Sequence, residues 1–229
     1  MHTKKRNLLF IILGSILLAG GLAAYYQNLL PTGAGIGKIV VIDPGHGGAD
    51  PGKIGINDSL EKDINLQISK KLGAYLRGNG YTVIFTRTTD CMLGDAGASN
   101  KKTADLNARI DIMEQQQVDF VISIHQNSYP DQQVHGAQCF YYHQSAEGKS
   151  LAEYLQKALV KISDPENKRL AKANDNYYIL KNSSCPVVIV ECGFLSNPEE
   201  AELLTTDSYQ NKIALSIATG IDSYLRSGQ

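Results

Sequence analysis

The feature that most limits how this chain can fold is the alternation, after residue 37, of short apolar runs with segments of helical periodicity. The apolar runs are typical of buried strands and lie at 38–43, 81–86, 120–124 and 187–190. Apolar residues recur with the period of amphipathic helices within 60–76, 106–113, 150–162 and 209–225. This order predicts a single α/β domain with a mostly parallel, twisted sheet and helices on both faces.

Local signals predict where some of these elements end. Ser59 is expected to be the N-cap of the first helix, and Gly78 or Gly80 to end it. Weak alternation over 136–142 predicts an edge strand. The stretch 88–104 has no periodicity and is expected to be a surface loop.

The first 30 residues have the composition of a targeting segment. Three basic residues at 4–6 are followed by an apolar stretch at 8–18 and by small residues up to Ala24. This order is typical of an export signal. Residues 1–30 are therefore predicted to be a signal peptide or membrane anchor, and the glycine-rich stretch 31–37 a flexible linker.

A retained anchor is favoured over cleavage near Ala24, because Tyr25 and Tyr26 are suited to the far interface of a membrane. The basic residues hold the N-terminus in the cytoplasm, so the domain at 38–229 is expected to be exported. It is membrane-anchored if the segment is retained, and secreted if the segment is cleaved.

The charge and cysteine content argue against a nucleic-acid-binding protein and against a disulfide scaffold. Three of the 22 basic residues lie in the first 35 positions, which contain no acid, so the rest of the chain carries 19 basic and 23 acidic residues. That balance argues against nucleic-acid binding, which normally requires a basic excess. The four cysteines are too few for a disulfide scaffold and lack the CxxC spacing of a metal site. Cys185 and Cys192 flank one predicted strand, which keeps them too far apart for a disulfide.

Three of the apolar runs end in residues capable of metal binding or catalysis. The first continues into Asp43-Pro-Gly-His46, the third into His125 and the fourth into Glu191. Parallel strands place such ends on one edge of the sheet. Glu61 begins the helix after the first strand and returns to that edge. We therefore expect these two histidines and two glutamates to converge.

Two imidazoles and one carboxylate are a typical ligand set for catalytic zinc, and the remaining carboxylate can then act as a general base. Taken singly, most of these residues have a structural explanation. His46 can be a turn residue, His125 a satisfied core histidine, and Glu61 a carboxylate favoured by the helix dipole. Glu191 is harder to explain in this way, because it follows an apolar run and a carboxylate is costly to bury without a partner.

Five motifs then make the chain resemble a known family. They are IDPGHGG at 42–48, SLEKDINL at 59–66, TR at 86–87, SIHQN at 123–127 and VIVECGFLSNPEEAELL at 188–204. In this combination and order they resemble the zinc-dependent N-acetylmuramoyl-L-alanine amidases, which are bacterial peptidoglycan hydrolases. The resemblance runs from Lys38 to Leu225. It implies that zinc is bound by His46, Glu61 and His125 and that Glu191 is catalytic.

The resemblance leaves some roles open. Cys192 stands where the family often has a small or aliphatic residue, and strand alternation directs its side chain away from the face of Glu191. Asn127 is a candidate for a hydrogen bond to the substrate or to a ligand. Asp43 is a candidate to orient His46, although it could equally cap the following turn. His135 and His143 are both expected to be exposed or structural, with His135 also a weaker candidate for the substrate groove.

The resemblance also implies a reaction and a setting. The expected reaction is hydrolysis, by zinc-activated water, of the amide between N-acetylmuramic acid and the L-alanine of the stem peptide. A lone catalytic domain behind a membrane segment resembles the amidases of spore cortex processing and germination. The absence of a wall-binding domain suggests an activating or targeting protein partner at the cell wall. The alternatives are a general autolysin, a zinc peptidase acting within the stem peptide, and a non-catalytic peptidoglycan-binding module.

Overall fold

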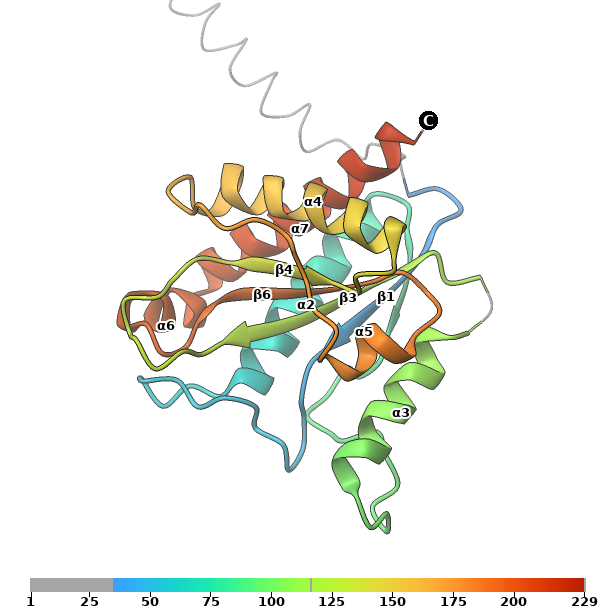
Figure 1. The fold of residues 1–229 in the computed structure, drawn as a ribbon, viewed down its shortest axis with the longest axis horizontal. Coiled ribbons are helices and arrows are strands. Elements are labelled where there is room, and N and C mark those ends of the chain that lie inside the picture. The colour runs from blue at the N-terminus through green and yellow to red at the C-terminus, as the bar shows by residue number, and fades with distance from the viewer. Residues whose placement is uncertain (1–34, 116, 229) are drawn as a thin grey trace, which may run out of the picture. The chain divides into compact units, whose positions relative to one another are not determined.

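The computed structural model describes residues 35–115 and 117–228, which form an α/β domain built on a six-stranded sheet (Figure 1). The strand order is β2-β1-β3-β6-β4-β5. The strands are β1 (Ile39–Pro44), β2 (Thr82–Phe85), β3 (Phe120–Asn127), β4 (Gln138–Tyr141), β5 (Lys172–Ala173) and β6 (Val187–Phe194). All neighbouring strands pair in parallel except β4 and β6, which are antiparallel. The prediction of a mostly parallel sheet is confirmed.

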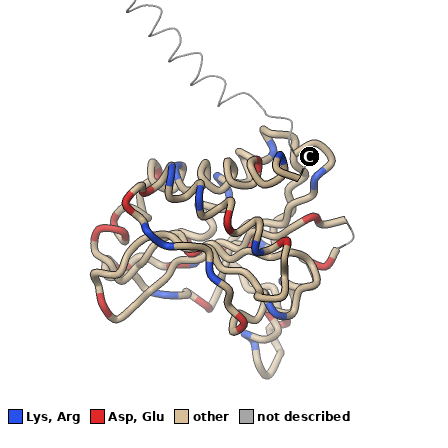
Figure 2. Tube along the Cα trace, turned by 45° about the horizontal axis from the view of Figure 1, so that its top comes forward, with Lys and Arg blue, Asp and Glu red and all other residues tan. Residues whose placement is uncertain are grey.

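Helices cover both faces of the sheet, as predicted (Figure 1). The helices are α2 (Glu61–Gly78), α3 (Lys101–Met113), α4 (Ala146–Ala158), a π-helical turn η1 (Leu159–Ser163), α5 (Tyr178–Asn182), α6 (Pro198–Thr205) and α7 (Asp207–Ser227). One core cluster joins the sheet to α2, α4 and α7, and the other joins it to α3 and α5. Lys and Arg are interspersed with Asp and Glu around this domain (Figure 2).

The central strands are apolar on both sides because both sides are covered. In β3, Ile122 and Ile124 face the α2 and α7 layer, whereas Val121 faces the α3 and α5 layer. In β6, Val190 and Cys192 belong to the first layer. This alternation explains why these strands appear in the sequence as uninterrupted apolar runs. It also confirms that Cys192 is a buried apolar residue on the opposite face from Glu191.

Several predicted boundaries are corrected by local contacts. Ser59 is not the N-cap of α2, because its hydroxyl donates to Asn57 Oδ1 (2.7 Å) and Leu60 occupies the N-cap position. The predicted edge strand is not outermost, since β5 lies beyond β4. The predicted loop 88–104 ends at Asn100, whose side chain accepts from Thr103 N and caps α3. The short helix α5 has no periodic signal in the sequence.

Of the N-terminal segments predicted from the sequence, the structure describes only residues 35–37 of the linker. There the expected flexible linker forms a turn, closed by a hydrogen bond from Lys38 N to Gly35 O (3.0 Å), and Gly35 is buried beside the Tyr81 ring. The predicted signal peptide or anchor at 1–30 lies outside the described residues. Within the described part of the chain, no helix combines the length and apolar character needed to cross a membrane.

Two helical glycines provide a paired test of this packing. A Cβ on Gly220 in α7 would lie 2.8 Å from Leu155 Cα in α4, whereas a Cβ on Gly78 would have no neighbour within 4 Å. Gly220→Ala should therefore lower the free energy of unfolding by about 1–3 kcal/mol through overpacking. Gly78→Ala should leave it unchanged or raise it by up to about 1 kcal/mol. Equal stability of the two variants in urea denaturation would contradict the close α4–α7 contact.

Candidate metal centre and active site

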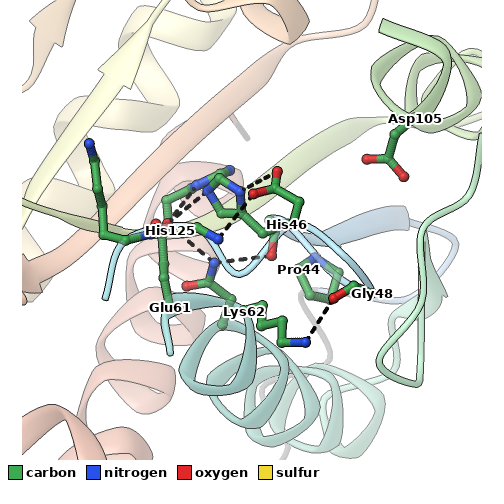
Figure 3. A network of polar contacts seen from close by, with 12 residues as sticks. Pro44, His46, Gly48, Glu61, Lys62, Asp105 and His125 are labelled. Carbon is green, nitrogen blue, oxygen red and sulfur yellow. Dashed lines mark hydrogen bonds and ion pairs between the residues drawn. The ribbon is translucent and has the colours of Figure 1, made fainter. Parts of the chain in front are cut away.

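The predicted convergence at one edge of the sheet is present in the structure. The parallel strands β1, β3 and β6 end on the same side, and His125 is the register partner of Glu191. Glu61 is the first residue of α2, which follows the loop after β1. Figure 3 shows the side chains of His46, Glu61 and His125 pointing toward one another.

These three side chains form a compact donor set. Glu61 Oε1 lies 3.0 Å from His125 Nδ1 and 3.2 Å from His46 Nε2. One donor atom from each residue lies within 4.8 Å of the others. Two imidazole nitrogens and one carboxylate oxygen at this spacing match the ligand chemistry of a three-residue catalytic zinc site. The residues present therefore fit the metal.

Glu61 is held in place by backbone donors as well as by the imidazoles. It is 2% exposed, and its Oε2 accepts from Lys53 N (2.8 Å) while its Oε1 accepts from Gln126 N (3.0 Å). Burial alone would raise the pKa of this carboxyl, but the hydrogen bonds and charges of His125 and His46 hold the pKa well below its usual range. Glu61 is thus ionised, as a metal ligand must be.

A strained turn presents His46 to the site. His46 has a φ of 61°, and the following glycines have φ values of 139° and 57°. Gly47 and Asp50 exchange two backbone hydrogen bonds of 3.0 and 3.1 Å, which closes the turn. The left-handed backbone is unusual for a residue with a side chain and persists only where surrounding contacts impose it.

Asp50, and not Asp43, orients His46. His46 Nδ1 lies 2.8 Å from Asp50 Oδ2, leaving Nε2 to face Glu61. Burial lowers the pKa of His46, but Glu61 first and Asp50 second outweigh it and raise the pKa. A carboxylate behind the imidazole fixes its tautomer and orientation, which is the usual support of a histidine ligand. The expectation that Asp43 orients His46 is therefore wrong.

Asp43 instead anchors the loop that carries His46. Its carboxylate is buried and accepts from Thr86 Oγ1 (2.6 Å), Ser123 Oγ (2.7 Å) and Arg109 Nη1 (2.7 Å). Arg109 also donates to Pro44 O (2.8 Å) and to His46 O (2.7 Å). Burial raises the pKa of Asp43, but the Arg109 charge and the two hydroxyl donors outweigh it and lower the pKa.

Two arginines complete this support, and neither was given a role from the sequence, although Arg87 belongs to the TR motif at 86–87. Arg109 in α3 also donates to Asp105 Oδ2 (2.7 Å). Arg87 at the end of β2 donates to Pro44 O (2.9 Å) and Gly45 O (2.9 Å). Arg109 stands among the apolar positions of an amphipathic helix, and a cation there requires a buried partner. That signal was available in the sequence.

Glu191 lies beside the donor set but differs from Glu61 in its surroundings. It is 5% exposed, and its Oε1 accepts from the Tyr177 hydroxyl (3.0 Å). Its Oε2 is buried and has no hydrogen-bond partner among the described protein groups. Burial raises the pKa of Glu191, while the nearby His125 and the Tyr177 hydrogen bond oppose that rise. A buried carboxylate oxygen without a partner, next to a metal-ligand set, suits a group that acts on a water or a substrate.

A groove of about 500 Å³ gives access to these residues. Its walls are formed by the N-terminal half of α3 and by the segment 176–179. Asn127 also lines the groove, and its Oδ1 accepts from Ser128 N (2.8 Å). Its proposed hydrogen bond to the substrate stays a prediction.

The remaining candidate residues lie elsewhere. His135 is exposed, as expected, and lines a separate cavity of about 280 Å³ with Glu200 and Tyr209 rather than the groove. His143 is exposed and lies 2.6 Å from Asp175 through its Nδ1. The four cysteines are all free, in agreement with the sequence.

Comparison with known proteins finds that the chain is similar to N-acetylmuramoyl-L-alanine amidases. Residues 40–223 match the Amidase_3 family, described as N-acetylmuramoyl-L-alanine amidase. The chain is 41% identical over 191 residues to the germination-specific N-acetylmuramoyl-L-alanine amidase of Bacillus subtilis, covering 82% of this chain and 80% of that protein. The CwlD amidase of Clostridioides difficile, solved in complex with the GerS lipoprotein, is 37% identical with a TM-score of 0.80, over 83% of this chain and 99% of that one. The amidase AmiC2 of Nostoc punctiforme is 33% identical with a TM-score of 0.73, over 83% and 98%.

The buried ion pair provides a test of how the His46 loop is supported. Arg109→Met leaves the carboxylates of Asp43 and Asp105 without their cation and should lower the free energy of unfolding by about 3–5 kcal/mol. Lys168→Met removes a cation from a highly exposed pair with Glu166 and should change it by less than about 0.5 kcal/mol. Urea denaturation of the metal-free protein measures both. Equal effects of the two substitutions would show that Arg109 does not stabilise the loop.

Proposed function

This chain belongs to the N-acetylmuramoyl-L-alanine amidase family, and from that membership we propose how its residues carry out the hydrolysis of peptidoglycan. The proposal assigns zinc to His46, Glu61 and His125, and the role of general base to Glu191. The observation that carries it is the pairing, in one groove, of a compact histidine–glutamate donor set with a buried carboxylate that has one unpartnered oxygen.

The scissile bond is the amide between the lactyl group of N-acetylmuramic acid and L-alanine. Zinc, when bound, polarises the carbonyl and makes water a stronger nucleophile at neutral pH. Glu191 accepts a proton from the attacking water as the new C–O bond forms. It then donates that proton to the L-alanine nitrogen as the C–N bond breaks, which releases the stem peptide. Asn127 lines the groove, and we propose that it forms a hydrogen bond with the substrate.

We further propose a role in spore cortex processing, in which stem peptides are removed before muramic-δ-lactam formation. The similarity to the germination-specific amidase of Bacillus subtilis supports this role over general autolysis. It extends over 82% of this chain and 80% of that protein, and the family match at 40–223 spans the four residues of the proposed centre. Family membership likewise favours amidase activity over a zinc peptidase. The intact donor set favours catalysis over a non-catalytic binding module.

The setting of the enzyme follows from its substrate. An enzyme acting on peptidoglycan works outside the cytoplasm, and attachment through residues 1–30 stays a prediction. The similar CwlD amidase was solved with the GerS lipoprotein bound. That complex supports the proposal that a protein partner delivers or activates this chain at its substrate.

Substitution of the proposed base tests the assignment. Glu191→Ala should abolish release of stem peptides, a loss of at least about 100-fold, because the proton acceptor is removed. It should keep both fold and zinc, since Glu191 is not among the three metal donors. His125→Ala should lose zinc, and Glu153→Ala, an exposed glutamate of α4, should change neither property. Mass spectrometry of the digested muropeptides and zinc content are the measurements. Normal cleavage by Glu191→Ala would contradict the mechanism.

The cortex role and the partner are tested together by comparing substrates. The zinc-loaded full chain should release intact stem peptides beginning with L-alanine, leaving free lactyl groups, with spore cortex cleaved faster than vegetative sacculi. Fragments cut within the stem peptide would instead identify a peptidase. If the chain alone digests purified cortex as fast as it does with a partner protein present, the proposed requirement for a partner is contradicted.

A further inference from the structure

Tyr177 stands at the N-cap position of α5 and is half-buried in the wall of the groove. Its hydroxyl donates to Glu191 Oε1 over 3.0 Å. We infer that Tyr177 is a positioning residue that holds one oxygen of Glu191 so that the other oxygen faces the reacting water. This inference rests on the proposed role of Glu191 as general base.

The two oxygens of Glu191 have unequal surroundings, and this asymmetry is the main support. Oε1 accepts the Tyr177 hydrogen bond, whereas Oε2 is buried without a partner among the described groups. The backbone of Glu191 is fixed by pairing with His125 on one side and Gln138 on the other. The terminal torsion of a glutamate is intrinsically broad and close to two-fold. A single hydrogen bond to one oxygen therefore restricts the main remaining freedom of the carboxylate.

Tyr177 is itself held in place. Its ring packs edge-on against Phe140 of β4, with centroids 5.6 Å apart and an interplanar angle of 69°. The next residue, Tyr178, donates its hydroxyl to Asn107 Oδ1 of α3 (2.8 Å). The Tyr177 ring is thus packed on the sheet, and the neighbouring residue ties this segment to α3. Preorganisation of this kind is what a supporting residue needs to restrict a catalytic group.

The charge state of the pair agrees with this geometry. Burial and the negative charge of Glu191 raise the pKa of the Tyr177 phenol, so the phenol stays protonated and acts as the donor. Donation to a carboxylate favours its ionised form. Tyr177 thereby opposes the effect of burial on Glu191, which must be ionised to accept a proton.

The test replaces only the hydroxyl. Tyr177→Phe keeps the aromatic contact with Phe140, and in the zinc-loaded full chain kcat should fall about 10- to 100-fold, the range for loss of a hydrogen bond to a charged group. KM should stay within about twofold, because the interaction is with the base and not with the substrate. Zinc content should equal that of the unsubstituted protein.

Tyr81→Phe is the matched control. Tyr81 also donates its hydroxyl to a carboxylate, Asp222 Oδ1 (2.7 Å), and is buried in the core away from the groove. This variant should keep kcat, even if its melting temperature falls. Crystal structures give a readout independent of activity. In Tyr177→Phe the Glu191 carboxylate should rotate or occupy more than one orientation, with His46, Glu61 and His125 unmoved.

The outcomes separate this inference from the function it rests on. Activity retained by Glu191→Ala would overturn the proposed mechanism itself. If Glu191→Ala is inactive but Tyr177→Phe has normal kcat, only the positioning role is overturned. It is also overturned by a rise in KM at unchanged kcat, which indicates substrate contact. Loss of zinc or of the fold in Tyr177→Phe would show a structural role instead and would overturn it as well.

Discussion

The buried ion pair of Arg109 with Asp43 is the interaction on which the loop carrying His46, and with it the candidate metal centre, depends. A carboxylate at the end of a fully covered strand is costly to bury alone, and Arg109 compensates its charge from α3 over 2.7 Å. The same guanidinium also donates to the carbonyl oxygens of Pro44 and His46. One side chain therefore neutralises the end of β1 and fixes the following turn, in which His46 adopts its left-handed backbone.

The carboxylates of Glu61 and Glu191 lie in different surroundings, which suit them to different proposed roles. Glu61 lies between two imidazoles and receives backbone donors, which lower its pKa and suit a metal ligand. Glu191 is equally buried but receives one phenol hydrogen bond, and burial raises its pKa. Pairs of titratable groups whose pKa values are pushed apart by their surroundings commonly divide the tasks of a catalytic site. The distinction between ligand and general base is consistent with this difference.

The groove is lined both by residues at the ends of the central strands and by residues of the surrounding helices. The sheet supplies the ends of β1, β3 and β6, while α3 and the segment 176–179 contribute to the walls. Catalytic groups carried by strands are held in position more precisely than groups carried by loops.

The sequence by itself predicted the α/β class, the central strands and the convergence of His46, Glu61, His125 and Glu191 at one edge of the sheet. It did so because apolar periodicity reports burial, and because parallel strands necessarily bring their ends to one edge. Only the tertiary structure decided that Asp50 rather than Asp43 orients His46, and that Tyr177 meets Glu191. Both contacts depend on the backbone path of a connecting segment. The first depends on the strained turn at His46, and the second on the non-periodic segment that leads into α5. Such paths are set by long-range contacts, and a local sequence pattern does not specify which residues are the partners in them.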